Sequence, residues 1–133
     1  MGVLRIDHVG IATEDLGPIV PLLRVLFPGV EPRVEIVADQ GVKTTSHRAG
    51  ESSLEFLQGL GRDGPVDRYL SRKGNGIHHI ALAVDDLEAT LEELAAAGIP
   101  LIDEKPRIGA EGKKIAFVHP KGTGGILIEL CQG

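Results

Sequence analysis

The sequence repeats itself at about half its length, and this internal duplication constrains the fold more than any other feature. Residues 5–30 read RIDHVGIATEDLGPIVPLLRVLFPGV and resemble residues 76–101, which read GIHHIALAVDDLEATLEELAAAGIPL. Each segment has a short apolar stretch with a histidine, an acidic turn, a helical pattern and a glycine. A second pair follows, because SLEFLQ at 53–58 matches LIELCQ at 127–132.

The spacing of the matched residues indicates a duplicated module within one domain. His79 follows His8 by 71 residues, and Glu129 follows Glu55 by 74 residues. Gly- and Pro-rich segments lie between the matched parts, but they are too short to separate independent domains. We therefore expect a single domain over 1–133, built from half-modules at about 5–60 and 76–132.

Periodicity and turn residues predict a β-α-β-β-β order in each half. In the first half, Thr13 or Asp15 is expected to cap a helix that runs to about Phe27. In the second half, Asp86 is expected to cap a helix over 85–97 that stops at Gly98. The fold class is therefore α+β, with two modules that pair into one cupped mixed β-sheet and helices outside. Strands are expected at 5–12, 32–38, 42–49, 52–58, 77–84, 100–103, 113–119 and 125–131, and a bridging helix at about 65–73.

Composition excludes several classes of protein. The 133 residues are 42% hydrophobic and 25% charged, as in ordinary globular domains, and the formal net charge is −5. This acidic balance argues against nucleic acid or an anionic membrane as partner. The single cysteine, Cys131, excludes an internal disulfide and suits the cytoplasm. No apolar run reaches the roughly 18 to 20 residues of a membrane helix.

Strand alternation places four chemically active residues on the inner faces of the predicted sheet. His8 and His79 stand at matched positions on the first strand of each half, and Glu55 and Glu129 on the last. Their bulky neighbours fall on the opposite, packed faces. Two imidazoles and two carboxylates form an N2O2 set that suits a divalent ion such as zinc, cobalt, nickel, manganese or iron. The duplication itself predicts this metal site.

The other histidines have different expected roles. His78 has the opposite parity from His79, so it is expected at most to support a metal ligand and not to bind the metal itself. His47 is expected to be a surface strand residue. His119 follows a strand end, where loop residues often carry binding function, so it is a candidate for substrate binding. The sequence contains no phosphate-binding glycine loop, dinucleotide fingerprint or G-x-S-x-G elbow.

The duplicated plan with one His and one Glu per half resembles the vicinal oxygen chelate (glyoxalase/bleomycin resistance/dioxygenase) superfamily. Within it, the chain is similar to the methylmalonyl-CoA epimerases over nearly its whole length. The most specific matching segment is DEKPRIGAEGKKIAFVHPKGTGGILIELCQ at 103–132. The other matching segments are IDHVGIAT at 6–13, QGVKT at 40–44 and GIHHIALAVDDL at 76–87.

This resemblance implies a glyoxalase-like fold and a metal-dependent epimerase that interconverts (2R)- and (2S)-methylmalonyl-CoA through a metal-stabilised enolate. It implies one divalent metal ion, cobalt, zinc, manganese or nickel, held by the same four residues that parity selects. Glu129 is the expected acid/base, with Glu55, a water or another residue as the second. The resemblance also suggests that Lys121 and Lys114 contact CoA, and Gln40 is a candidate for orienting the substrate.

The sequence departs from the family at one point. Some members carry a glutamate just after the Gln-Gly-Val segment, whereas this chain continues from Val42 with Lys43, Thr44 and Thr45. The identity of the second base therefore stays open. The alternatives are a lactoylglutathione lyase (glyoxalase I) and a non-catalytic drug-binding protein of the same fold. The expected partners are an acyl-CoA substrate and a second copy of the chain in a homodimer.

Overall fold

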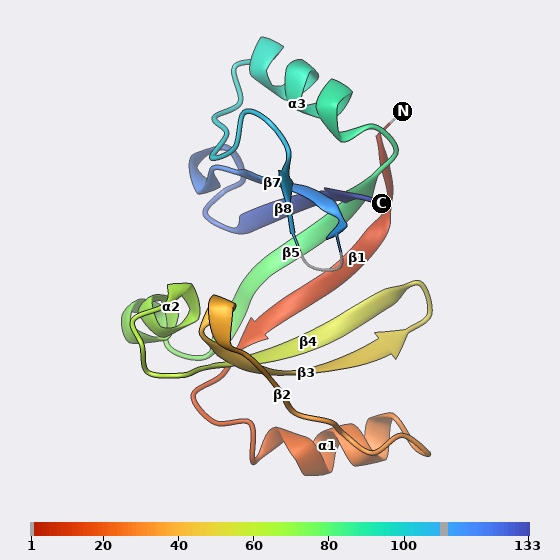
Figure 1. Cartoon of the computed structure of the whole chain (residues 1–133), viewed down its shortest axis with the longest axis vertical. Helices are drawn as coiled ribbons and strands as arrows, with labels where there is room; N and C mark the ends of the chain where they lie inside the picture. The colour runs from red at the N-terminus through yellow and green to blue at the C-terminus, as the bar shows by residue number, and fades with distance from the viewer. Residues whose placement is uncertain (1, 110–111) are drawn as a thin grey trace. The chain divides into compact units, whose positions relative to one another are not determined.

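The computed structural model describes residues 2–109 and 112–133 of the chain. Over these residues the protein is an α+β structure with a mixed β-sheet and three α-helices (Figure 1). Each half has the predicted β-α-β-β-β order, and one further helix connects the halves. The elements are β1 (Val3–Ala12), α1 (Ile19–Leu26), β2 (Glu35–Val37), β3 (Val42–Ala49), β4 (Ser52–Gly59), α2 (Pro65–Lys73), β5 (Gly76–Val84), α3 (Leu87–Ala96), β6 (Arg107–Ile108), β7 (Lys114–Val118) and β8 (Leu127–Gln132).

The chain forms two compact units, and each contains part of the sheet. The terminal unit comprises residues 1–8 and 79–133, and the central unit comprises residues 9–78. In the terminal unit the strand order is β1-β5-β8-β7-β6, with β5 and β8 parallel and the β8-β7 and β7-β6 pairs antiparallel. In the central unit the order is β2-β3-β4-β1, with antiparallel β2-β3 and β3-β4 pairs.

Aliphatic side chains fill the core of each unit. In the terminal unit, Leu87 and Leu91 of α3 are buried against Val84, Ala116 and Leu130 of the strands. Full burial of one such leucine contributes about 1.5 to 3 kcal/mol. In the central unit the buried residues form two clusters, which are Ala12, Val42, Leu57 and Val66, and Leu16, Leu23 and Phe56.

The ends of the two matched helices differ. The side chain of Asp86 accepts a hydrogen bond from the Ala89 amide at 3.1 Å, and Gly98 follows α3 with a φ of 78°. Both predictions for α3 are confirmed. By contrast, α1 begins at Ile19, later than predicted, because Asp15 accepts from the Gly17 amide at 2.9 Å and so forms a local turn.

Two glutamines at matched positions of the repeat make the same hydrogen bond in their own halves. The amide oxygen of Gln58, at the end of β4, accepts a hydrogen bond from the Leu16 backbone at 2.9 Å. The amide oxygen of Gln132, at the end of β8, accepts one from the Leu87 backbone at 2.7 Å. Each glutamine thus ties the last strand of its module to the segment that enters the module's helix.

Two predictions about individual segments are wrong. The strand expected at 100–103 is reduced to a single bridge between Leu101 and Val118, and the short β6 lies further along the chain. His47 is not a surface residue, because it is 4% exposed, hydrogen-bonds the Thr45 hydroxyl at 2.8 Å and packs against Phe27. Phe27, at the C-terminal end of α1, covers this face of β3.

No helix in the described ranges combines the length and the apolar character needed to cross a lipid bilayer.

Candidate metal centre

The two matched histidines meet in the terminal unit. His8 comes from β1 and His79 from β5, and their Nε2 atoms lie 3.0 Å apart. The rings are nearly perpendicular, with centroids 5.1 Å apart. Both side chains are largely enclosed, with 14% and 12% exposed. The imidazole nitrogens are therefore directed at one shared point.

Glu129 completes a three-residue cluster. Strand β8 runs parallel to β5 and pairs Glu129 with Ala81, two residues beyond His79. This register brings Glu129 Oε1 to 3.9 Å from His8 Nε2 and 4.0 Å from His79 Nε2. Among the described residues, these three offer ligand atoms within 4.8 Å of one another. Parity and the repeat predict the same three residues.

The cluster fits a divalent ion by distance and by chemistry. A point equidistant from the two Nε2 atoms and Glu129 Oε1 lies about 2.1 Å from each, which is a normal bond length from such an ion to imidazole or carboxylate. Two nitrogens and one oxygen form the donor set that borderline divalent metals prefer. His8, His79 and Glu129 would hold the ion.

The remaining predicted ligand, Glu55, belongs to the central unit. It lies on β4, where it pairs with Ser46 of β3, and its side chain is half-buried. Its role as a metal ligand and as a base stays a prediction.

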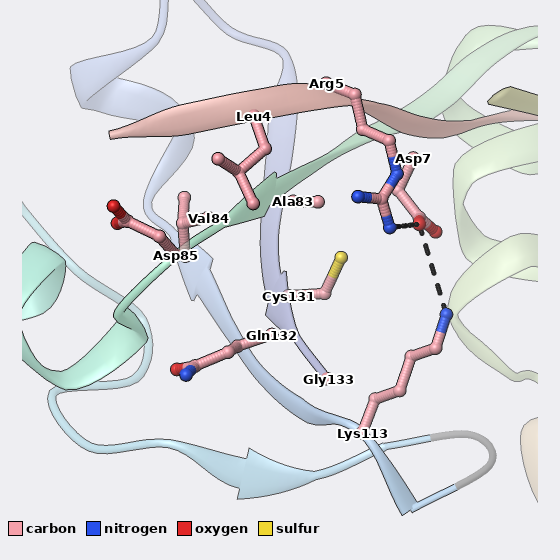
Figure 2. A pocket seen from close by; sticks show the side chains of 10 residues that line it. All are labelled: Leu4, Arg5, Asp7, Ala83, Val84, Asp85, Lys113, Cys131, Gln132 and Gly133. Atoms are coloured by element: carbon pink, nitrogen blue, oxygen red, sulfur yellow. Dashed lines mark hydrogen bonds and ion pairs between the residues drawn. The ribbon is translucent and has the colours of Figure 1, made fainter. Parts of the chain in front are cut away.

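Sequence reasoning missed Asp7 because strand parity directs neighbouring side chains to opposite faces. In the structure, Asp7 Oδ2 lies 2.9 Å from His8 Nδ1. Asp7 Oδ1 lies 3.4 Å from an Arg5 guanidinium nitrogen and 4.0 Å from Lys113 Nζ (Figure 2). Burial raises the pKa of Asp7, but the His8 hydrogen bond and the nearby cations outweigh it, so this pKa is lower than usual. The one available signal was the acid beside His8, where the second half has His78.

A pocket of about 350 Å³ adjoins this network in the terminal unit. Figure 2 shows the side chains of Arg5, Asp7 and Lys113 on one side of it and the Cys131 thiol facing the same space. Its lining combines apolar side chains with charges of both signs. The lining residues are Leu4, Arg5, Asp7, Ala83, Val84, Asp85, Lys113, Cys131, Gln132 and Gly133.

The Cys131 thiol is not a nucleophile at neutral pH. It stands two residues after Glu129 on β8 and is 4% exposed. Burial raises its pKa to about 11, with Asp7 and Glu129 adding to the effect. A thiol with this pKa stays protonated, so Cys131 serves as part of the pocket wall.

The residues predicted to bind substrate lie in separate local settings. Gln40 is exposed at the end of a short 3-10 helix in the central unit. Lys114 Nζ lies 3.5 Å from Glu88 on α3. His119 Nδ1 accepts the Lys121 amide at 3.1 Å, so these two residues share one turn. Of the two adjacent lysines, Lys113 is the one that reaches the pocket.

His78 has a contact of its own, away from the cluster. Its ring stands edge-on to Tyr69 of α2 in the central unit, with centroids 5.2 Å apart. Burial, and then the charge of Arg72, lower the pKa of His78 below its ordinary value. Adjacent histidines on β5 thus have different surroundings, as their opposite parity predicts.

Comparison with known proteins identifies the relatives of this chain. It is 34% identical to the mitochondrial methylmalonyl-CoA epimerase of Homo sapiens, over 96% of this chain and 73% of that protein. The crystal structure of methylmalonyl-CoA epimerase from Mycobacterium tuberculosis matches with a TM-score of 0.82 and 31% identity, covering 98% of this chain and 88% of the other.

A methylmalonyl-CoA epimerase in complex with methylmalonyl-CoA and NH4+ matches with a TM-score of 0.79 and 33% identity, over 98% of this chain and 95% of that one. The profile of the glyoxalase/bleomycin resistance protein/dioxygenase superfamily matches residues 7–117. The matched region includes His8 and His79, and the fold around them is the one predicted from the repeat. The chain therefore belongs to the glyoxalase/bleomycin resistance protein/dioxygenase superfamily.

Proposed function

We propose that this chain is a metal-dependent epimerase that interconverts (2R)- and (2S)-methylmalonyl-CoA. The observation that carries the proposal is the cluster of His8, His79 and Glu129, whose ligand atoms surround a point suited to a divalent ion. The similarity to methylmalonyl-CoA epimerases over nearly the whole chain supports the substrate. We propose that the enzyme is a single domain over 1–133.

The chemistry follows from the substrate and from the residues of the site. A bound divalent ion supplies Lewis acidity, which polarises the thioester and lowers the barrier to loss of the α-proton. His8 and His79 are neutral donors, so they hold the site without cancelling its positive charge. Glu129 has two oxygens, and we assign to it the removal or delivery of the proton on one face.

The second proton transfer needs a group on the opposite face of the substrate. We assign it to Glu55, which is also the fourth proposed ligand. The segment after Gln40 offers no acid in this chain, so the base found there in some family members has no counterpart. For CoA we propose contacts from Gln40, Lys114, His119 and Lys121. All four side chains are polar or basic, and those of Gln40, Lys114 and Lys121 are exposed.

The ion is proposed to be cobalt, zinc, manganese or nickel, all of which accept nitrogen and oxygen donors. The enzyme is proposed to act as a homodimer in the cytoplasm, in propionate metabolism. The single cysteine, which cannot form an internal disulfide, supports the location.

The test is exchange of the α-proton of methylmalonyl-CoA in D2O, followed by proton NMR with cobalt-loaded protein. We expect loss of the α-proton signal at substoichiometric enzyme, and at least a hundredfold slower loss with Glu129→Gln. The matched control is Glu92→Gln, the same change at an exposed glutamate on α3, which should exchange at the wild-type rate.

Absence of exchange in metal-replete protein would overturn the epimerase proposal. The same sample would then be given the hemithioacetal of methylglyoxal and glutathione, since turnover of that substrate would identify a lactoylglutathione lyase. Inactivity with both substrates would leave the non-catalytic binding protein.

A further inference from the structure

Asp7 connects the metal centre to the charged side of the pocket. One of its carboxylate oxygens lies 2.9 Å from His8 Nδ1, and the other is near Arg5 and Lys113. The Asp7 side chain is 16% exposed and that of His8 is 14% exposed, so the hydrogen bond between them is largely shielded from water. Figure 2 shows Arg5 and Lys113 approaching Asp7 from two directions.

The chemistry of imidazole gives this hydrogen bond a consequence. A neutral imidazole carries its proton on one nitrogen only, and the other nitrogen then has the free lone pair. Carboxylate oxygens of Asp7 accept but do not donate, so the proton of His8 belongs on Nδ1. His8 Nε2, the atom 3.0 Å from His79 Nε2, is then the atom with the lone pair.

The two halves of the repeat differ at this position. The repeat matches Asp7 with His78, which packs against Tyr69 and offers no carboxylate. The orienting acid is therefore a feature of the first half, added to the duplicated His and Glu pattern. Arg5 and Lys113 fix the second oxygen of Asp7, which restrains rotation of the carboxyl group.

We propose that Asp7 is a positioning residue that holds His8 in the Nδ1–H tautomer and aims Nε2 at the metal, with Arg5 and Lys113 holding the carboxylate in place. This inference rests on the proposed metal site. Carboxylates behind a histidine ligand typically contribute a factor of about 10 to 100 in metal affinity. Asp7 is not one of the three clustered ligands but contacts His8, so its effect on the ion is transmitted through His8.

The first test measures zinc affinity by competition with a chromophoric chelator. In Asp7→Asn, the amide N–H donates to Nδ1 as readily as its oxygen accepts, so the tautomer with a proton on Nε2 becomes populated. We expect the zinc Kd to rise by about 10- to 100-fold. The control is Asp85→Asn, which removes a carboxylate from the lining of the same pocket. The Asp85 carboxylate accepts a hydrogen bond from the Gly2 amide. The zinc Kd of this variant should stay within about twofold of the wild-type value.

The second test begins with the wild-type protein, whose result does not depend on how a variant folds, and then compares Asp7→Asn. Two-dimensional NMR of the 15N-labelled imidazoles in the zinc-loaded protein reports which nitrogen of each histidine carries the proton. We expect Nδ1–H for His8, and in Asp7→Asn before zinc is added a mixture of the two tautomers. A merely structural role for Asp7 would leave the His8 tautomer unchanged in the variant.

Equal zinc affinity in Asp7→Asn and wild type overturns the inference, as does a His8 Nδ1 that carries no proton in the zinc-loaded protein. Neither readout uses substrate, so the outcome is separate from that of the epimerase assay. A protein that binds zinc with His8 in the Nδ1–H form but exchanges no α-proton overturns the proposed function alone. A protein that takes up no divalent metal overturns both.

Discussion

Adjacent histidines on β5 provide a sharp test of the proposed metal centre. His79 Nε2 lies 3.0 Å from His8 Nε2, whereas the His78 ring packs against Tyr69. Replacing each with alanine removes the same atoms from neighbouring positions of one strand. His79→Ala should therefore abolish stabilisation by zinc, and His78→Ala should leave that stabilisation intact.

The magnitudes follow from linkage. Zinc at a hundred times its Kd stabilises the folded protein by about 2.7 kcal/mol. In a domain of this size each kcal/mol shifts Tm by about 4 °C, so the wild-type shift is about 10 °C. If loss of this one ligand weakens zinc binding a thousandfold, the shift in Tm at the same zinc concentration falls below about 1 °C. His78→Ala loses a ring contact worth about 0.5 to 1.5 kcal/mol, which lowers Tm without zinc by about 2 to 6 °C.

The assay is thermal unfolding followed by circular dichroism, with EDTA and with zinc, for wild type and both variants. We expect His79→Ala to lose the shift in Tm that zinc causes, and His78→Ala to keep that shift but to have a lower Tm in EDTA. A full zinc shift in His79→Ala would refute the assignment of His79 as a ligand. Equal loss of the zinc shift in both variants would show that the strand as a whole, and not one imidazole, is what matters.

Three further predictions concern the fold and the pocket. Gly59→Ala should lower the free energy of unfolding by about 1 to 3 kcal/mol, because a Cβ there would collide with an Asp67 oxygen, and the Asp67 carboxylate accepts three backbone hydrogen bonds. Urea unfolding measures this, and the cost should nearly vanish in an Asp67→Ala background. Gln132→Ala should cost about 1 to 3 kcal/mol in the same assay, because the Leu87 amide loses its acceptor, and Gln58→Ala should cost a similar amount through Leu16. Cys131 should react with a thiol reagent at least a hundredfold more slowly in native protein than in denaturant, because it is 4% exposed and its pKa is about 11; fast labelling of native protein would contradict the burial.

The duplication made most of the fold predictable from the sequence. Each half supplies the same order of elements, so a weak signal in one half is supported by its counterpart in the other. Where the halves differ, the predictions failed. The first helix begins late because Asp15 forms a turn before Pro18, and the second half has no such proline. The predicted strand at 100–103 forms only one bridge to Val118, because the Phe117 amide donates to the Asp103 side chain and not to a backbone carbonyl, which ends the ladder.

The candidate site followed the same pattern. His8, His79 and Glu129 were predictable because they stand at matched positions and share a face by parity. Asp7 was not predictable, because the comparison of the two halves selects residues that are the same in both, and the position that matches Asp7 holds His78. Its side chain also reaches around to His8, where ideal alternation directs it to the opposite face. In a duplicated sequence, residues that support a site in one half only are therefore found at positions where the two halves differ.

Strand register decides which of the two adjacent lysines at the start of β7 faces the candidate site. Lys113 and Lys114 are identical residues, and a basic pair by itself does not indicate which one faces a ligand. Strand β7 pairs Phe117 with Glu129 and Ile115 with Cys131, so the odd-numbered residues of β7 share the face that carries Glu129. The even-numbered residues Ala116 and Val118 pack with α3, and Lys114 accordingly pairs with Glu88 on that helix. Lys113 lies one residue before β7, and the same alternation places it on the face that carries Glu129, where it reaches Asp7. The two lysines carry the same charge, so it is the strand register that gives them different partners.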